Sequence, residues 1–204
     1  MTKNALLIFV KNPQLGFVKT RLARTVGNEK ALAIYKELLS HTVLITRSLP
    51  IEKSVFYSDY IEDDLWESSL FQKNIQDGDN LGVRMRNAFK ISFAAGYAKV
   101  VIIGTDCFEL TSEIIMQAFA VLEYNDIVIG PATDGGYYLL GMKKEFSPLF
   151  KNISWSTPEV LNQTIEICRN HSLFWFLLPE LSDIDDEEDL KKHESQLPLN
   201  QKKQ

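Results

Sequence analysis

Short apolar runs alternate with longer amphipathic segments along most of this 204-residue chain. The apolar runs have the length and the branched or aromatic side chains of strands, and they cover residues 5–10, 54–57, 71–76, 100–103, 126–130, 137–141 and 173–178. Apolar positions three and four residues apart predict helices at residues 29–48, 82–95, 111–123 and 157–170, and a further helix from about residue 186. Strands that alternate with helices predict an α/β fold with a mainly parallel sheet and helices on both faces.

Polar side chains mark several of the expected helix starts. Thr111 is expected to cap the helix that follows it, and either Asp79 or Asn80 is expected to cap the helix near residue 82. Asp185, with Glu188 three residues later, resembles a reciprocal capping pair for the last helix. Most of the acidic charge near the end of the chain is therefore interpreted as helix-start chemistry.

Composition narrows the class of protein. Hydrophobic residues make up 45% of the chain, enough for a globular core, and the net charge of −5 argues against a general nucleic-acid surface. No apolar run approaches the roughly 20 residues of a membrane helix, and the first residues lack a signal-peptide cleavage site. Cys107 and Cys168 lie far apart and are expected to be free thiols in a reducing cytoplasm. We expect one domain over residues 1–197 and a frayed tail at residues 198–204.

A basic loop follows the first expected strand. It carries Lys11, Lys19 and Arg21 around Gly16. Glycine allows close backbone approach and cations attract phosphate, so this loop is a candidate diphosphate site, although its spacing matches neither a P-loop nor a dinucleotide fingerprint. A solvated basic loop is the alternative. Arg84, at the start of a later helix, could pair with a phosphate or with a carboxylate, and a plain capped helix entry explains it equally well.

Three aspartates occupy positions where carboxylates perform chemistry. Asp106 follows the strand at residues 100–103, and ligands of parallel sheets collect beyond the carboxyl ends of strands. Asp134 lies in a glycine-rich turn, where it could act as a base or bind a sugar, although a hairpin turn explains the same residues. Asp183 has no capping duty and could approach a metal. Trp155 is interpreted as a core anchor that could also line a pocket mouth.

Several of these segments, taken together and in order, resemble a known family. The matching segments span residues 9–22, 81–85, 103–107, 130–141, 153–157 and 183–185. They are similar to the bacterial DUF2064 family, within the GT-A superfamily of nucleotide-diphospho-sugar transferases. The chain departs from the family pattern at Asn80, which lies between Asp79 and Leu81, and at Phe108, where the family often has proline and the superfamily its second metal-binding aspartate.

The resemblance implies a single-domain, Rossmann-like GT-A fold with a mainly parallel, mixed sheet that binds a nucleotide-sugar donor with Mg²⁺ or Mn²⁺. Asp106 takes the place of the metal-binding motif. Because the motif's second carboxylate is missing, either Asp106 suffices alone or Asp183 joins it. The resemblance assigns the binding of the diphosphate to a set of basic and glycine residues, namely Lys11, Gly16, Lys19, Arg21 and Arg84. It assigns the binding of the acceptor to Asp134 and its neighbours Gly135, Gly136 and Tyr137.

The reaction implied is transfer of a sugar from a nucleotide-diphospho-sugar to a small-molecule acceptor. Asp134 is the first candidate for the base that takes the acceptor's proton, and Asp106 is expected to act through the metal. A nucleotidyltransferase that uses a nucleoside triphosphate is the first alternative, and a non-catalytic nucleotide-binding module is the second. The sequence leaves homo-oligomerisation open.

Overall fold

The computed structural model describes residues 3–193, so the expected tail at residues 198–204 and the expected domain limit at residue 197 lie outside the described residues. Within residues 3–193, seven strands form one sheet in the order β3-β2-β1-β4-β6-β5-β7. The strands are β1 (Asn4–Val10), β2 (Glu52–Tyr57), β3 (Gln72–Ile75), β4 (Lys99–Ile103), β5 (Ile127–Pro131), β6 (Tyr137–Met142) and β7 (Trp175–Leu177). Strand β6 runs antiparallel to β4 and β5, and the other neighbouring pairs are parallel. The predicted mixed, mainly parallel sheet is confirmed.

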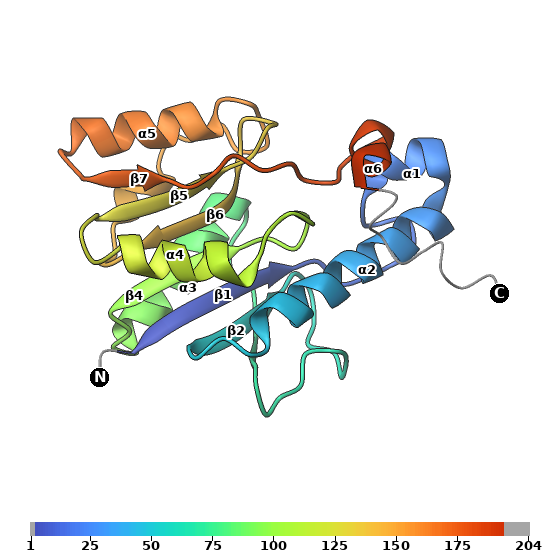
Figure 1. Cartoon of the computed structure of the whole chain (residues 1–204), viewed down its shortest axis with the longest axis horizontal. Helices are drawn as coiled ribbons and strands as arrows, with labels where there is room; N and C mark the ends of the chain where they lie inside the picture. Colours follow the sequence, from blue (N-terminus) through green and yellow to red (C-terminus); the bar gives the residue numbers. More distant parts are fainter. Residues whose placement is uncertain (1–2, 194–204) are drawn as a thin grey trace.

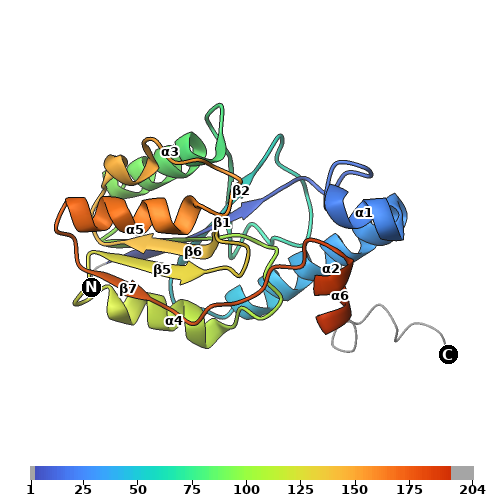
Figure 2. The same ribbon diagram turned by 90° about the horizontal axis from the view of Figure 1, so that it is seen from above.

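Helices cover both faces of this sheet (Figure 2). They are α1 (Thr20–Val26), α2 (Asn28–Thr46), α3 (Leu81–Ala94), α4 (Ser112–Val121), the short 3-10 helix η1 (Ser147–Phe150), α5 (Val160–Asn170) and α6 (Glu187–His193). Leu6 and Ile8 of β1 pack in the core under α2 and α4, whereas Ala5 and Leu7 pack in the core under α3, η1 and α5. The alternation of strand side chains thus supplies an apolar surface on each side.

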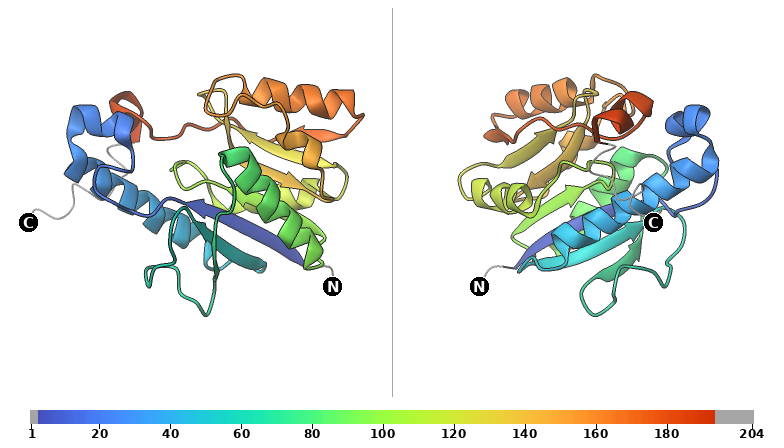
Figure 3. Two further views of the ribbon diagram at one scale, coloured as in Figure 1. Left: turned by 180° about the vertical axis from the view of Figure 1, so that it is seen from behind. Right: turned by 45° about the vertical axis from the view of Figure 1, so that its right-hand side comes forward.

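The carboxyl ends of the parallel strands meet at one edge of the sheet, and the chain returns to that edge at its end. After β7, residues 178–186 run along this edge and lead into α6, which lies beside α1 (Figures 1 and 3). A small separate core joins α1, α2 and α6 through Leu22, Ala31, Ile34, Leu38, Ile184 and Leu190. This packing brings the end of the described chain to the basic loop that follows β1.

The helix starts agree with the sequence patterns in some places and differ in others. Thr111 caps α4 by accepting from the amide of Ile114, and Asn80, of the two expected candidates, caps α3. Helix α5 begins only at Val160, later than the expected start at Thr157, whose hydroxyl donates to the carbonyl of Ser154 and accepts the amide of Glu159 in the turn before the helix. Helix α1 was not expected at all, since it has seven residues and buries only Leu22. Such a short helix has too few turns to show a helical period.

The expected capping pair at the last helix is wrong by one residue. Asp186, not Asp185, accepts the amides of Glu188 and Asp189. Asp189 in turn accepts the amide of Asp185 through Oδ2. The carboxylate of Asp185 is therefore left for other partners. Among the helices formed within residues 3–193, none combines the length and the apolarity that a membrane crossing requires.

Candidate active site

A cleft of about 600 Å³ opens at the carboxyl edge of the sheet. Its walls come from the β1–α1 loop, the end of β4, the turn between β5 and β6, the loop before α5 and the segment after β7. The predicted site residues that line it are Lys11, Lys19, Arg21, Asp106, Asp134, Gly136, Tyr137 and Asp183. Residues far apart in the sequence thus share one cavity, while Gly16, Gly135 and Arg84 are not among its lining residues.

Lys19 lies at the centre of the charged part of this cleft. Its Nζ is 2.9 Å from Oδ1 of Asp106 and 3.0 Å from Oδ1 of Asp185, and its side chain is only 4% exposed. Burial by itself would lower the pKa of Lys19, but the charges of Asp106 and Asp185 outweigh burial and raise it. Lys19 therefore remains a cation inside the cleft. Its backbone is left-handed, with φ of 48°, a conformation that non-glycine residues adopt uncommonly.

Asp185 bridges Lys19 and Arg21, two cations of the basic loop. One carboxylate oxygen bonds Lys19, and the other bonds a guanidinium nitrogen of Arg21. Burial would raise the pKa of Asp185, but Lys19 and Arg21 outweigh that effect and hold the pKa below its usual value. Sequence reasoning missed Asp185 as a site residue because its position beside a helix start is explained equally well by capping.

Asp183 is another carboxylate in the same cleft, and it lies near Asp106. The amide of Ile184 donates to the carbonyl oxygen of Asp106 at 3.0 Å, which fixes the segment after β7 against the end of β4. Asp183 thereby lies close enough to Asp106 for their charges to interact. Burial, with the negative charge of Asp106 added, raises the pKa of Asp183 to about 7. An acidic pair of this kind is stabilised by a cation.

The donor set fits a hard divalent ion that completes its coordination from a ligand. Within residues 3–193, no group of three or more His, Cys, Asp or Glu side chains is arranged to hold a metal by itself. Mg²⁺ commonly uses one or two protein carboxylates together with substrate phosphates and water. Asp106 and Asp183 supply such a pair. Phe108 does not take part, since its ring packs against His41 with centroids 4.6 Å apart.

The wall opposite the basic loop is apolar and tightly fitted. Trp155 lies over Gly82 in the first turn of α3, where an added Cβ would come within 2.3 Å of the indole. Gly135, at φ of +86°, packs on the backbone of Pro158 with equally little space. Trp155 also packs on the core under α3 and α5, so it serves both as the expected core anchor and as a wall of the cleft.

Asp134 and Tyr137 lie where that wall meets the acidic pair. Asp134 is exposed, and its Oδ1 accepts the amide of Gly136 at 2.8 Å, which orients the carboxylate. The hydroxyl of Tyr137 is buried and has no hydrogen-bond partner among the described residues. Burial raises the pKa of Tyr137, so it stays protonated. An unpaired buried hydroxyl is costly unless a ligand or water satisfies it.

A second cleft of about 540 Å³ adjoins the first and contains Arg84. The two clefts share Lys11, Phe17, Leu81 and Ser156. The Nε of Arg84 donates to the carbonyl of Gly78, 2.8 Å away, and Arg84 lines only the second cleft. Lys19 lines only the main cleft, on the other side of the four shared residues. The structure therefore separates Arg84 from Lys19 and Arg21, which line only the main cleft, whereas Lys11 lines both clefts.

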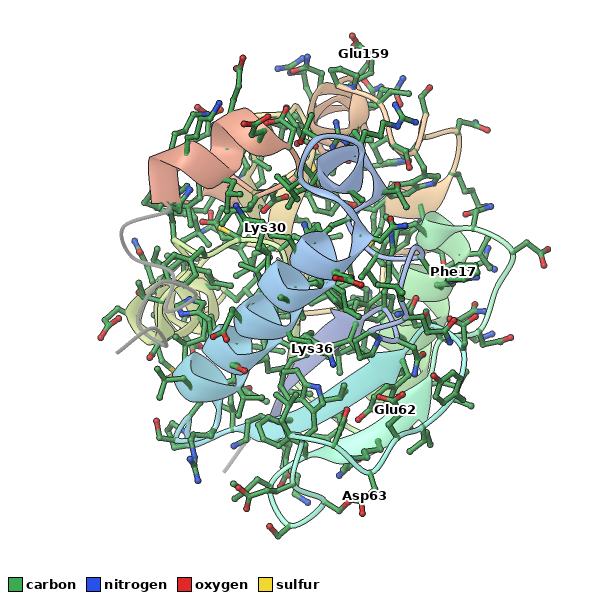
Figure 4. All side chains as sticks on the ribbon, turned by 90° about the vertical axis from the view of Figure 1, so that its right-hand side faces the viewer. Phe17, Lys30, Lys36, Glu62, Asp63 and Glu159 are labelled. Carbon is green, nitrogen blue, oxygen red and sulfur yellow. The ribbon has the colours of Figure 1, made fainter. Side chains whose placement is uncertain are left out.

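Hydrogen bonds hold the loops around the second cleft in place. Oδ1 of the buried Asn12 accepts from Ser58 and from the amide of Asp59, and the side chain of Gln76 donates to the carbonyls at the ends of β1 and β2. Phe17 projects at the boundary of the two clefts on the side of the molecule seen in Figure 4, with 74% of its surface exposed.

Tyr35 is another lining residue that the sequence did not indicate. From helix α2, its hydroxyl accepts the amide of Lys11 and donates to the carbonyl of Lys11, and it also approaches Thr105. It therefore fixes the start of the basic loop against the end of β4. A tyrosine within a regular amphipathic helix gives no local signal of such a role.

Comparison with known proteins decides the family. The model described as "Uncharacterized protein conserved in bacteria (DUF2064)" matches residues 42–157. The chain belongs to this family. A crystal structure from Desulfovibrio desulfuricans G20, provisionally named a nucleotide-diphospho-sugar transferase, is 32% identical and superposes with a TM-score of 0.86. The match covers 99% of this chain and 90% of that one. The resemblance found in the sequence motifs is confirmed.

More distant structures share the fold. A 4-diphosphocytidyl-2C-methyl-D-erythritol synthase from Anaerococcus prevotii DSM 20548 superposes with a TM-score of 0.58 at 7% identity, over 95% of each chain. A manganese complex of a protein from Mycobacterium tuberculosis H37Rv superposes with a TM-score of 0.54 at 10% identity, over 94% of this chain and 97% of that one. No curated protein matches the sequence.

Proposed function

We propose that the protein is a metal-dependent glycosyltransferase that moves a sugar from a nucleotide-diphospho-sugar to a small neutral acceptor. The observation that carries this proposal is the contact of Lys19 with Asp106 at 2.9 Å inside a cleft that also holds Arg21 and Asp183. A diphosphate bound through a divalent ion needs cations and carboxylates on adjoining walls. The provisional name of the 32% identical relative supports the same donor class.

Each group of residues has a distinct part in the proposed reaction. Lys11, Lys19 and Arg21 would bind the diphosphate and stabilise the charge that grows on it as the bond to the sugar breaks. Asp106 and Asp183 would hold Mg²⁺ or Mn²⁺, which supplies further positive charge to the leaving diphosphate. The carboxylate of Asp134, oriented by the amide of Gly136, would take the proton of the acceptor hydroxyl.

The walls of the cleft favour glycosyl transfer over nucleotidyl transfer. Among the described residues that line the main cleft, the cations come from the one loop that carries Lys11, Lys19 and Arg21. The opposite wall is apolar or carries hydroxyl groups, and it is formed by Leu81, Tyr137, Trp155, Ser156, Thr157, Pro158 and Val160. A phosphorylated second substrate would need cations on that wall as well. A neutral hydroxyl compound fits it without them.

Product analysis distinguishes the candidate functions. The protein would be incubated with Mn²⁺, a panel of nucleotide-diphospho-sugars and neutral sugars or alcohols, and the release of nucleoside diphosphate would be measured. Glycosyl transfer predicts nucleoside diphosphate and a glycosylated acceptor. Pyrophosphate released from a nucleoside triphosphate with a sugar phosphate would instead establish the nucleotidyltransferase. Nucleotide binding without turnover of any donor would leave the non-catalytic module.

A control variant tests whether the site itself is responsible. Asp106→Asn keeps the side chain's shape but removes the charge, so metal-dependent nucleotide binding should be lost. Lys144→Ala, on the loop after β6 and outside both clefts, serves as the control for expression and handling. Unchanged metal-dependent affinity in Asp106→Asn would reject the role given to Asp106.

A further inference from the structure

The basic loop is already partly neutralised by the protein itself. Asp185 bonds Lys19 through one carboxylate oxygen and Arg21 through the other. These are two of the three cations that line the main cleft. A ligand phosphate that approaches the loop therefore meets cations whose charge a carboxylate already balances.

Local structure leaves the carboxylate of Asp185 free for this contact. Asp186 performs the capping of α6, and the amide of Asp185 is held by Oδ2 of Asp189. The backbone before Asp185 is also fixed, because the amide of Leu181 donates to Pro131 and the amide of Ile184 donates to Asp106, and the backbone after it is fixed by the bond from the amide of Leu190 to the carbonyl of Asp186. Because the backbone is held in this way, displacement of the Asp185 carboxylate from the cations would take place by rotation of its side chain.

A carboxylate that bridges an ammonium and a guanidinium uses the same donors that a phosphate would use. Both anions accept charge-assisted hydrogen bonds, and guanidinium groups bind either in the same planar geometry. The two oxygens of Asp185 thus occupy the donors of Lys19 and Arg21 that the proposed diphosphate site requires.

We infer that Asp185 is an internal stand-in for the substrate's diphosphate, which holds Lys19 and Arg21 in the cleft and is displaced when the ligand binds. This inference rests on the proposed diphosphate site but not on the reaction that follows. It makes Asp185 a residue that sets affinity: it keeps the buried Lys19 charged and placed, and it weakens diphosphate binding because the ligand must replace it.

The same arrangement couples the two ligands of the site. Lys19 also bonds Asp106, one of the two residues proposed to hold the metal. A diphosphate that attracts the ammonium of Lys19 weakens the ion pair between Lys19 and Asp106. The carboxylate of Asp106 is then available to bind a metal ion. Diphosphate and metal should therefore each raise the affinity of the other, as linkage requires.

Calorimetric titration of inorganic pyrophosphate in the presence of EDTA tests the inference without metal, sugar or turnover. Asp185→Asn removes the competing charge at nearly constant shape, and we expect its affinity for pyrophosphate to exceed that of the wild type about tenfold or more, equivalent to about 1.4 kcal/mol. Asp186→Asn is the matched control, since Asp186 is the next residue and only caps the helix. Its pyrophosphate affinity should equal that of the wild type.

The double variant Asp185→Asn with Lys19→Met identifies the site of binding, because it should lose the affinity gained by Asp185→Asn. Circular dichroism would establish that each variant is folded. Equal or weaker pyrophosphate binding by folded Asp185→Asn overturns the inference, as does an equal gain in Asp186→Asn. Failure of the proposed transferase would appear differently, as absent turnover of nucleotide sugars by the wild type, and would leave the pyrophosphate result intact.

Discussion

Gly82 lies directly beneath the indole of Trp155, so closely that an added Cβ would fall 2.3 Å from the ring. Glycine is usually a poor helix residue, yet it occupies the first turn of α3 because any side chain would displace Trp155. The contact joins a helix that borders the second cleft to the apolar wall of the main cleft. The position of that wall therefore depends on a residue that carries no side chain.

Gly82→Ala should destabilise the protein by about 1–3 kcal/mol despite alanine's better helix propensity, because the methyl group overpacks against a rigid ring. Urea denaturation would measure the change in the free energy of unfolding. Gly104→Ala is a suitable control, since a Cβ there meets nothing within 4 Å. Stabilisation by Gly82→Ala would show that Trp155 moves aside freely, contrary to the fitted wall described above.

Lys19→Ala should lower the free energy of unfolding by about 1–3 kcal/mol at neutral pH. The substitution removes a buried cation from between Asp106 and Asp185, but the Asp106 side chain is 44% exposed and Asp185 keeps its bond to Arg21, so solvent and Arg21 offset part of the loss. Lys11→Ala, which removes an exposed lysine of the same loop, should change stability little. Urea denaturation of both variants in metal-free buffer makes the comparison, and equal effects would count against the central position of Lys19.

The stability of the metal-free protein should depend on pH through Asp183. Burial and the neighbouring charge of Asp106 raise its pKa to about 7 in the folded protein, above the ordinary value of about 3.9. The folded state then holds the proton more tightly than the unfolded state, so the contribution of Asp183 is favourable below about pH 4 and is lost as the pH rises through 7.

Asp183→Asn removes this dependence. The variant should become more stable relative to the wild type as the pH is raised from 5 to 8, which chemical denaturation at a series of pH values would show. Asp63→Asn, in an exposed loop that lines neither cleft and is labelled in Figure 4, provides the control and should follow the wild type. A constant difference between Asp183→Asn and the wild type across this range would contradict the raised pKa.

Phe17→Ala should weaken nucleotide binding without loss of stability. Phe17 is 74% exposed at the boundary of the two clefts, so its ring contributes little to the core but is placed to stack on a base. Base stacking on an aromatic side chain contributes about 1–3 kcal/mol. The shift in melting temperature produced by nucleoside diphosphates with Mn²⁺ would be smaller in the variant.

Phe174→Ala offers a matched control, because Phe174 is 72% exposed but lies just before β7 and outside both clefts. The control should keep the full ligand-induced shift. Equal shifts in the two variants would remove Phe17 from the proposed nucleotide site.

The helix starts show how far local sequence can specify structure. Thr111 was identifiable as a cap, and the cap of α3 was narrowed to Asp79 or Asn80, because a capping side chain bonds an amide three residues away and this geometry depends only on neighbours in the chain. Asp185 was misassigned for the complementary reason. The sequence left the first residue of the last helix uncertain by one position, and in the structure the helix begins at Glu187, so Asp186 caps it. Asp185 instead bonds Lys19, which is 166 residues away and outside the reach of any local pattern.

The pattern of apolar and polar positions by itself determined the mainly parallel sheet and the helices on both of its faces, because burial of each element requires a local periodicity. The residues that follow the expected strands could also be read directly from the sequence, which placed cations and aspartates at strand ends. Only the tertiary structure decided that Asp185 holds Lys19 and Arg21, that Arg84 lies in a separate cleft and that Trp155 walls the site. These relationships depend on the path of residues 178–186 along the carboxyl edge. That path is set by the packing of Ile184 and Leu190 against α2, a contact between distant parts of the chain that no local pattern records.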